Sequence, residues 1–312
     1  MQEFNFNERK KQNAEFITPE RLRLFLKDEI GEVKEKTIFD PAGGSGQLLF
    51  NIEAKRKIVN EINKDCEEYC KINNIDEFYN NDYILFDDSD LNYDIAISNY
   101  PYSLKATEEQ NKYLSKKYNL KKWTGTLDYE FIIKSFQHSN DGLGYYLCFN
   151  GIAYREGEKR HRQYLIDNNF IEKIYLLENT GFEDTNIAIL YLKLNKNKVD
   201  DKITLQIQDN YEIKQTKIII NQDLIDKDYN FSITNFIKQE QEEIDYTAEL
   251  KQINEQLIET NINNIKKCLE TFYTIDIFEG NKGSQSLYKR YVDKLLLTIE
   301  EDVKNRGKNV KE

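Results

Sequence analysis

The 312-residue sequence has only three prolines, two histidines, one methionine and one tryptophan, and it has no long apolar run. One of its longest apolar stretches, residues 187–192, is far shorter than the ~20 residues that a membrane-spanning helix needs. Residues 1–15 lack the basic start and apolar stretch of a signal peptide. These absences predict a cytoplasmic protein that does not use a membrane as a partner.

Cysteine is also scarce. The four cysteines are Cys66, Cys70, Cys148 and Cys268. The first two stand four residues apart and can share a helix face, but no second pair or nearby histidine completes a metal site. We therefore expect reduced thiols and no bound metal.

Basic residues are outnumbered, with 44 Lys and Arg against 55 Asp and Glu and a formal net charge of −11. This balance disfavours a protein that coats nucleic acid, because phosphate binding requires Lys and Arg. It does not exclude a nucleic-acid enzyme with a local basic cleft. Basic residues gather twice, at Lys116, Lys117, Lys121 and Lys122 before Trp123, and at Arg155, Lys159, Arg160 and Arg162. Each cluster can be a phosphate track or ordinary solvated loop charge.

Residues 1–36 are expected to form a polar lead and then a helix that contributes to a binding pocket. The helix start reads Thr18-Pro19-Glu20, which combines a capping hydroxyl, a proline at the first helical position and an acid in the first turn. At the other end, residues 240–312 repeat apolar residues at steps of three and four. This pattern predicts a helical tail for assembly.

Residues 37–239 alternate short apolar runs with helical stretches, and 39% of the whole sequence is hydrophobic, enough for a core. The alternation predicts an α/β domain with a mostly parallel sheet flanked by helices. The expected strands are 37–39, 57–61, 93–98, 145–149, 171–177 and 187–194, and the expected helices include 64–74 and 128–140. The last two strands fit an antiparallel hairpin that closes the sheet.

The turn after the first strand has the composition of a ligand-binding loop. It reads Asp40-Pro41-Ala42-Gly43-Gly44-Ser45-Gly46. Its glycines let the backbone approach a bound group closely, and the helix that follows favours an anionic group at its N-terminus. No Gly-Lys-Ser/Thr follows, so a nucleoside-triphosphate loop is disfavoured. A tight turn without a ligand is the alternative.

Two further strands end in residues suited to a binding site. Glu61 follows the glycine-rich turn by about 20 residues, the spacing at which an acid binds ribose hydroxyls. The third strand runs into Asn99-Tyr100-Pro101-Tyr102, and a buried strand seldom ends in this way unless its tip is functional. A solvated Glu61 and a turn that begins at Asn99 are the alternatives.

With these motifs in this order, the sequence resembles the S-adenosylmethionine-dependent amino-group methyltransferases of DNA. It is most similar to the modification subunits of type I restriction-modification systems and to related adenine-N6 methylases. Residues 40–46 resemble their cofactor loop, and residues 99–102 resemble their Asn/Asp-Pro-Pro-aromatic signature. Four other segments of this family are matched by Phe16-Ile17-Thr18-Pro19, Glu61-Ile62-Asn63, residues 181–187 and residues 227–231. The likeness covers residues 15–240 and implies a Rossmann-like class I methyltransferase sheet.

The resemblance implies S-adenosyl-L-methionine as the cofactor and DNA as a partner. The implied cofactor-binding residues are Phe16, Ile17, Thr18, Pro19, Asp40, Ala42, Gly43, Gly44, Ser45, Gly46, Glu61, Asp82 and Asn99. Asp82 is placed like the acid that accepts a hydrogen bond from the cofactor's adenine amine, although a surface turn there is the alternative.

The implied reaction is methyl transfer to the N6 amine of an adenine flipped out of DNA. This amine is a poor nucleophile because its lone pair is delocalised into the ring, and hydrogen bonds accepted from its N–H groups favour the attacking form. The Asn99 side-chain oxygen can accept one such bond and the Tyr100 carbonyl the other. Tyr102 can stack on the base, and Pro101 stiffens the tip.

Tyr100 departs from the family pattern, which has proline at this position. Asn-x-Pro-Tyr also occurs in the similar adenine dimethyltransferases of ribosomal RNA, so an RNA adenine-N6 methyltransferase is one alternative. A non-catalytic methyltransferase-fold binding subunit is another. Because no obvious reader of DNA sequence follows the likeness, we expect a specificity subunit or a second copy to bind through helices in residues 240–305. Packing of these helices on the sheet is the competing interpretation.

Overall fold

The computed structural model describes residues 18–180 and 188–237, together with the isolated positions 256, 260, 267, 293, 294, 297 and 298. The chain divides into two compact units, Met1–Gln239 and Glu240–Glu312. The isolated positions of the second unit are helical and exposed. The rest of the predicted tail, the loop 181–187 and residues 1–17, which include Phe16 and Ile17, lie outside the described residues.

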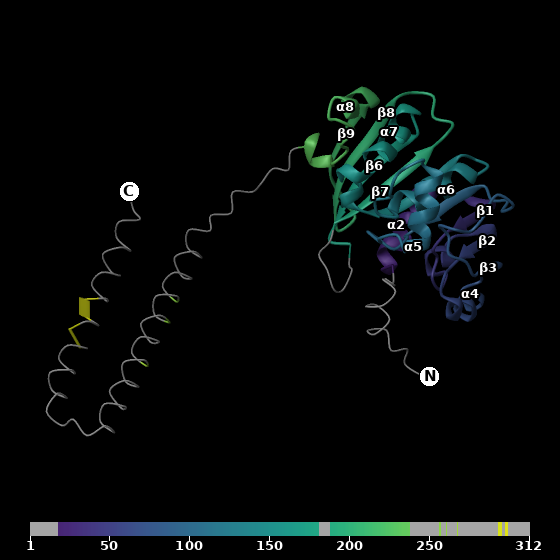
Figure 1. The fold of residues 1–312 in the computed structure, drawn as a ribbon, viewed down its shortest axis with the longest axis horizontal. Coiled ribbons are helices and arrows are strands. Elements are labelled where there is room, and N and C mark those ends of the chain that lie inside the picture. The colour runs from purple at the N-terminus through teal and green to yellow at the C-terminus, as the bar shows by residue number, and fades with distance from the viewer. Residues whose placement is uncertain are drawn as a thin grey trace, which may run out of the picture. The chain divides into compact units, whose positions relative to one another are not determined.

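The described part of the first unit is a nine-stranded sheet with helices on both faces (Figure 1). The strands are β1 (Val33–Asp40), β2 (Ala54–Asn60), β3 (Glu77–Tyr79), β4 (Ile95–Ser98), β5 (Leu143–Phe149), β6 (Ile171–Glu178), β7 (Ile189–Asn195), β8 (Lys202–Asp209) and β9 (Glu212–Ile220). The α-helices are α2 (Glu20–Ile30), α3 (Gln47–Phe50), α4 (Glu67–Ile72), α5 (Glu108–Lys117), α6 (Asp128–His138), α7 (Lys159–Asp167) and α8 (Asn221–Ile225).

The strand order places a crevice at the middle of the sheet. The order is β3-β2-β1-β4-β5-β7-β6-β8-β9. The strand β1 pairs in parallel with β2 on one side and with β4 on the other, so the direction of winding reverses between β1 and β4. In open α/β sheets, ligands bind beyond the carboxyl ends of the strands at such a switch point. The glycine-rich turn follows β1. Residues 99–102, here called the Asn99 tip or the tip, follow β4, so the fold brings both motifs to this crevice.

The sheet confirms the predicted α/β architecture but extends further than the sequence patterns indicated. The strands β6 and β7 do form the expected antiparallel hairpin. This hairpin does not close the sheet, because β7 lies between β5 and β6 and the sheet continues into β8 and β9. The strand β8 was missed although Ile203, Leu205 and Ile207 are buried at alternate positions, and β9 was missed because most of its side chains are exposed.

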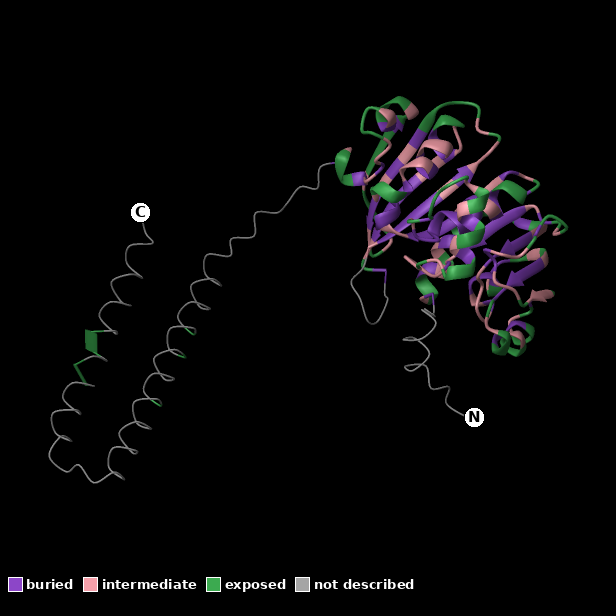
Figure 2. Cartoon of the chain, viewed as in Figure 1, coloured by how far each residue is buried: buried purple, intermediate pink, exposed green. Residues whose placement is uncertain are grey.

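Side chains on the sheet alternate between two cores, as the two-residue period of a strand requires. The central strands are largely buried (Figure 2). In β1, Ile38 joins the core that contains residues of α2, α3 and α4, whereas Phe39 joins the opposite core, beneath α6 and α7. Burial of each such side chain contributes about 1.5–3 kcal/mol. Both faces of the central strands are therefore covered, and their carboxyl ends are left to form a site. Among the described residues, no helix has the length and apolar character to cross a bilayer.

Candidate active site

A cavity of about 600 Å³ opens at the switch point of the sheet. It is lined by the turn after β1, the end of β2, the loop after β3 and the tip after β4. The predicted site residues that line it are Thr18, Asp40, Ala42, Gly43, Gly44, Ser45, Glu61, Asp82, Asn99, Tyr100, Pro101 and Tyr102. Pro19 and Gly46 were also predicted to bind the cofactor, but neither is among the lining residues.

The glycine-rich turn is held against β2 by backbone hydrogen bonds. The Gly43 amide donates to the Asn60 carbonyl over 3.1 Å, and the Gly46 amide donates to the Gly43 carbonyl over 2.8 Å. Gly44 has a φ of +55° and a Cβ there would meet no atom within 4 Å. Gly46 differs, because a Cβ there would stand 2.5 Å from Ile75. Gly44 therefore leaves open space beside the cavity, whereas Gly46 is needed for packing.

Glu61 connects the end of β2 to the same turn. One oxygen of its carboxylate accepts from the Gly44 amide over 3.0 Å, and the other accepts from the Asn63 amide over 2.9 Å. An ionised carboxylate has about four acceptor positions. These two bonds orient the carboxylate in the cavity wall and are compatible with hydroxyl groups of a ligand as further donors.

Asp40 joins the turn to the tip. Its Oδ1 accepts from the Ser98 hydroxyl over 2.7 Å and from the Ala42 amide over 3.1 Å. Burial raises the pKa of this carboxyl to about 7, although both hydrogen bonds oppose the shift. Because Ser98 immediately precedes Asn99, this contact ties the end of β1 to the base of the tip.

The Asn99 side chain is held from both ends. Its Nδ2 donates to the Thr18 hydroxyl over 2.7 Å, and its Oδ1 accepts from the Tyr102 hydroxyl. The prediction that Thr18 caps α2 is wrong, since Pro19 occupies the N-cap position and no side chain caps that helix. The hydroxyl instead fixes the orientation of the Asn99 amide, with the oxygen and nitrogen of that amide assigned from these contacts.

Tyr100 explains how a residue other than proline is accommodated in the tip. Its side chain is buried and stacks on Phe131, with ring centroids 5.5 Å apart and planes 5° apart. Burial raises its pKa well above the usual value. The ring therefore belongs to the core, and the backbone is the part of Tyr100 suited to a contact in the cavity.

Asp82 lies in the cavity wall, but its carboxylate already has protein partners. One oxygen accepts from Gln110 Nε2 over 2.8 Å, and the other accepts from the Ile84 amide over 3.0 Å. Gln110 comes from the first turn of α5 and forms a capping box with Thr107. A side chain of α5 thus orients this acid in the cavity wall.

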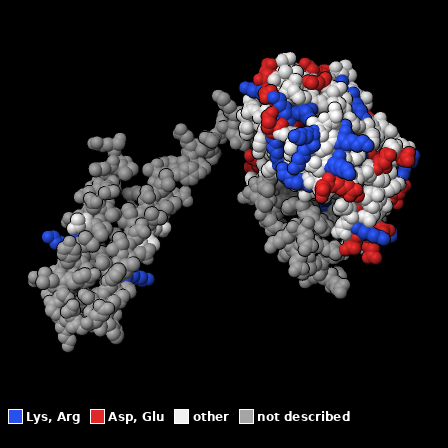
Figure 3. All heavy atoms as spheres, viewed as in Figure 1, with Lys and Arg blue, Asp and Glu red and all other residues white. Residues whose placement is uncertain are grey.

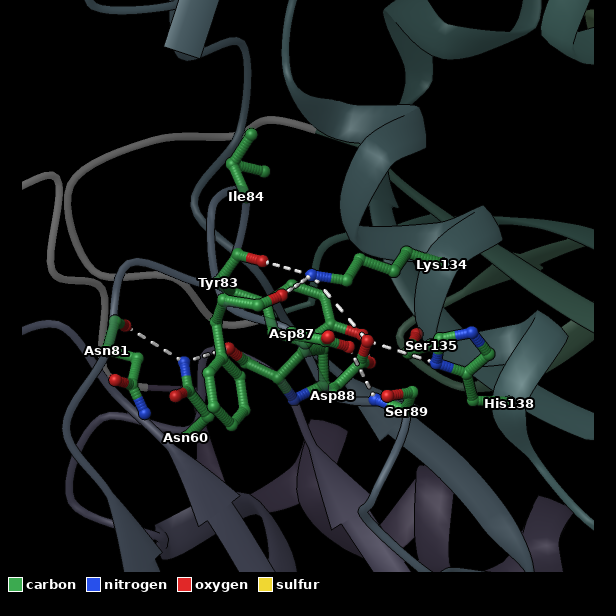
Figure 4. A network of polar contacts seen from close by, with 12 residues as sticks. Asn60, Asn81, Tyr83, Ile84, Asp87, Asp88, Ser89, Lys134, Ser135 and His138 are labelled. Carbon is green, nitrogen blue, oxygen red and sulfur yellow. Dashed lines mark hydrogen bonds and ion pairs between the residues drawn. The ribbon is translucent and has the colours of Figure 1, made fainter. Parts of the chain in front are cut away.

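The loop that carries Asp82 is anchored from α6 (Figure 4). Lys134 Nζ donates to the Tyr83 carbonyl over 2.6 Å and to the Phe86 carbonyl, and it lies 3.6 Å from the buried Asp88 carboxylate. Asp88 also accepts from the Tyr83 hydroxyl over 2.7 Å and pairs with His138 Nδ1 at 3.0 Å. Burial lowers the pKa of Lys134, and the Asp88 charge opposes this.

Several cavity residues were not predicted. They include Asn60, Leu104, Gln110, Leu127 and Phe131. Most follow the tip in sequence, and apolar residues there could not be distinguished from ordinary core. The Thr107-x-x-Gln110 capping box was readable and could have indicated α5.

The basic residues of the two predicted clusters differ in exposure to solvent. Arg162 is 1% exposed and donates to the carbonyls of Tyr229, Ile152 and Arg155, so it belongs neither to a phosphate track nor to solvated loop charge. Trp123 is also buried. The exposed members are Lys116, Lys117, Lys121 and Lys122. Lys and Arg gather over the part of the visible face where Figure 1 places α7 (Figure 3).

Comparisons with known proteins agree on a family. A sequence model described as N-6 DNA methylase matches residues 85–272, more than half of the chain. The methylase subunit of the type I restriction enzyme MpnII of Mycoplasma pneumoniae is 29% identical over 235 residues, which cover 61% of this chain and 42% of that subunit. The chain therefore matches less than half the length of this relative.

Two solved structures have the same fold. The methyltransferase subunit of a type I restriction-modification system from Streptococcus thermophilus superposes with a TM-score of 0.61 at 17% identity, over 72% of this chain and 60% of that one. A protein of Listeria monocytogenes, provisionally described as a class I S-adenosylmethionine-dependent methyltransferase, gives 0.51 at 16% identity, over 69% and 72%. The predicted class I methyltransferase sheet is confirmed, and by its sequence match the chain belongs to the N-6 DNA methylase family.

Proposed function

We propose that this chain binds S-adenosyl-L-methionine and transfers its methyl group to the N6 amine of an adenine in DNA. The observation that carries the proposal is that one cavity contains both the glycine-rich turn and the Asn99 tip. The contacts of Asp40 with Ser98 and of Asn99 with Thr18 connect the two motifs. Membership of the N-6 DNA methylase family supports the same reaction.

The residues around the cavity fit this cofactor. Its volume of about 600 Å³ lies in the range of small-molecule sites. Glu61 would hold the ribose hydroxyls and the open side of Gly44 would face the cofactor, while Asp82 would accept from the adenine amine. Asn60 Oδ1 is a buried acceptor with no hydrogen-bond partner among the described residues, and it suits a ligand donor.

When bound, the cofactor supplies an electrophilic methyl group on a sulfonium. Two acceptors of the chain would act on the adenine amine: Asn99 Oδ1 would accept from one N–H, and the Tyr100 carbonyl from the other. Both bonds favour the pyramidal nitrogen, and holding this nitrogen in line with the methyl group provides most of the acceleration. Thr18 and Tyr102 fix the Asn99 amide, so the acceptor is oriented before the base enters.

We also propose that a separate specificity subunit reads the DNA sequence. The support is that the relative from Mycoplasma pneumoniae is named as a methylase subunit of a type I restriction enzyme. The predicted helices of residues 240–305 are the proposed contact for that subunit or for a second copy. Co-purification of the full chain with proteins encoded beside its gene tests this. A full chain that methylates one defined site alone, as a monomer, would contradict it.

A transfer assay with isotope-labelled S-adenosyl-L-methionine tests the reaction. The full chain, with its co-purified partners, is incubated with duplex DNA and separately with structured RNA. We expect label on adenine N6 of DNA, and loss of this label in Asn99→Ala with cofactor binding retained in calorimetry. Label on RNA alone would favour the RNA enzyme, and no cofactor binding would favour a non-catalytic subunit.

A further inference from the structure

A cluster of buried polar side chains adjoins the tip and takes no part in the site described above. Asp128 and Glu158 have side chains that are 0% and 2% exposed. The Thr126 hydroxyl contacts Asp128 Oδ2 over 2.5 Å and also contacts Glu158 Oε1. Arg155 Nη1 lies 3.3 Å from Glu158 and 3.7 Å from Asp128. Two buried carboxyl groups, one hydroxyl and one guanidinium therefore form a continuous unit.

This unit contacts the chain at Ser103, the residue that immediately follows the tip. The Ser103 amide donates to both oxygens of Asp128, over 3.2 and 3.0 Å. Its hydroxyl accepts from Arg155 Nη2. Ser103 has a φ of +58°, a left-handed conformation that a residue other than glycine adopts at some cost. The hydrogen bonds that Ser103 donates to Asp128 and accepts from Arg155 stabilise this conformation, and with it the direction in which the chain leaves the tip.

The Thr126 hydroxyl lies at the centre of the cluster. It has one proton and can donate to only one of the two carboxyl groups at a time, while its oxygen accepts from Arg155 Nη1 over 3.4 Å. Burial raises the pKa of Asp128, and the hydrogen bonds from Thr126 and Ser103 and the charge of Arg155 oppose this shift. The Arg155 guanidinium thus compensates for part of the cost of burying the two carboxyl groups.

The members come from two stretches of the chain that meet beside Ser103. Thr126 lies in the short segment that bridges to Lys105. Asp128, two residues further on, begins α6, and Arg155 and Glu158 lie in the segment that leads into α7. A polar unit that only stabilised the packing of these helices would not need to bond the residue at the end of the tip. The contacts with Ser103 point to a role in the geometry of the site.

We propose that Thr126, Asp128, Arg155 and Glu158 are positioning residues that hold Ser103 and thereby fix the Asn99 and Tyr100 acceptors for methyl transfer. The proposal rests on the proposed function. Asp40 and Thr18 fix the chain where it enters the tip, through hydrogen bonds with Ser98 and Asn99. The cluster fixes the chain where it leaves the tip, through hydrogen bonds with Ser103.

The test compares Asp128→Leu with a matched control, Asp94→Leu. Asp94 immediately precedes β4, at the opposite end from the tip, and its carboxylate also accepts a backbone amide, that of Thr37, over 2.7 Å. We expect Asp128→Leu to lower the single-turnover transfer rate at least ~10-fold, because small misplacements of reacting groups are costly. The Kd for S-adenosyl-L-methionine should change less than about 3-fold, since the cluster lies outside the cavity lining. Asp94→Leu should leave the transfer rate near wild type.

Hydrogen exchange of the full chain reports on the anchor independently of activity. Peptides that span residues 99–107 should exchange faster in Asp128→Leu, whereas peptides from residues 40–48 should not. If Asp128→Leu does not fold, Ser103→Gly is the second variant. Glycine adopts the positive φ readily and the substitution removes only the bond to Arg155, so a fall of a few-fold in rate is expected.

The outcomes separate the two proposals. Transfer at the wild-type rate in the folded variant, or unchanged exchange at residues 99–107, would overturn the positioning role while the reaction stands. A loss of rate that is matched by an equal loss of cofactor affinity would also overturn it. If the wild-type chain with its partners transfers no methyl group, the proposed function fails, and the positioning role fails with it.

Discussion

Single hydrogen bonds between residues far apart in sequence connect the two halves of the cavity. Asp40 bonds Ser98, and Thr18 bonds Asn99. The first bond joins the glycine-rich turn to the last residue of β4, and the second joins the segment before α2 to Asn99. Changes at Asp40 or Thr18 should therefore alter how the tip is held as well as how the cofactor binds.

Thr18→Val tests the bond that orients the Asn99 amide. Valine has a similar shape but no acceptor, so Asn99 Nδ2 loses its partner and the amide can rotate away from the substrate. We expect the single-turnover rate of methyl transfer to fall about 10-fold. Thr18→Ser keeps the hydroxyl and is the control. A Thr18→Val chain that is faster than Thr18→Ser would contradict this role.

Asp40 makes stability depend on pH in an unusual direction for a carboxyl group. Its pKa of about 7 in the folded chain lies above the ordinary value of 3.8. The folded state therefore binds more protons between these values, and its stability falls as the pH rises from about 4 to about 7. The slope is at most about 1.4 kcal/mol per pH unit.

The Asp40→Asn variant lacks this titration. The unfolding free energy of the wild type relative to Asp40→Asn should be higher at about pH 5 than at about pH 8, by an amount on the order of 2 kcal/mol. Urea unfolding of both chains at the two pH values measures it. A difference between the chains that is the same at both pH values would show that Asp40 is ionised throughout this range.

Among the larger elements, the loop between β3 and β4 depends on a helix for its position. It contains Asp82 in the cavity wall, and Lys134 of α6 bonds two of its carbonyl groups (Figure 4). This loop contains turns at residues 83–85 and 89–90 but no helix or strand. Lys134 therefore holds this loop through its carbonyl groups, as backbone hydrogen bonds between neighbouring strands hold a strand.

Lys134→Met should weaken cofactor binding through this loop. Loss of hydrogen bonds to the carbonyls of Tyr83 and Phe86 corresponds to about a 3- to 10-fold higher Kd for S-adenosyl-L-methionine, measured by calorimetry. Lys196→Met is the matched control, because Lys196 also donates to two carbonyl groups, those of Gln137 and Ser139, away from the cavity. Equal effects of the two substitutions would show that only general stability is involved.

The elements also differ in how much of their structure can be predicted from the sequence. The central strands and the switch-point motifs were readable, because apolar runs that end in Asp40 or Asn99 have few alternatives. The position of β7 between β5 and β6 was not, since pairing order leaves no mark in one strand's sequence. The buried cluster at Ser103 was also missed, because Asp128 and Glu158 look like solvated acids until the fold brings them to one hydroxyl.

For the whole molecule, the net charge of −11 does not contradict a DNA substrate. Lys116, Lys121 and Lys122 are exposed, while acids such as Asp128 and Glu158 count toward the formal net charge although they are buried. An acidic chain gains less affinity from phosphates than a basic one. This agrees with the proposal that a separate specificity subunit reads the DNA sequence.

Base-resolution mapping of adenine methylation tests the central claim most directly. The mapped DNA comes from cells that express the full chain together with the proteins encoded beside its gene, with Asn99→Ala as the matched control. We predict N6-methyladenine at one recurring sequence with the wild type and none with Asn99→Ala. Genomic DNA without N6-methyladenine in cells that contain the folded wild-type chain and its partners, or the same methylation with Asn99→Ala, would contradict the account.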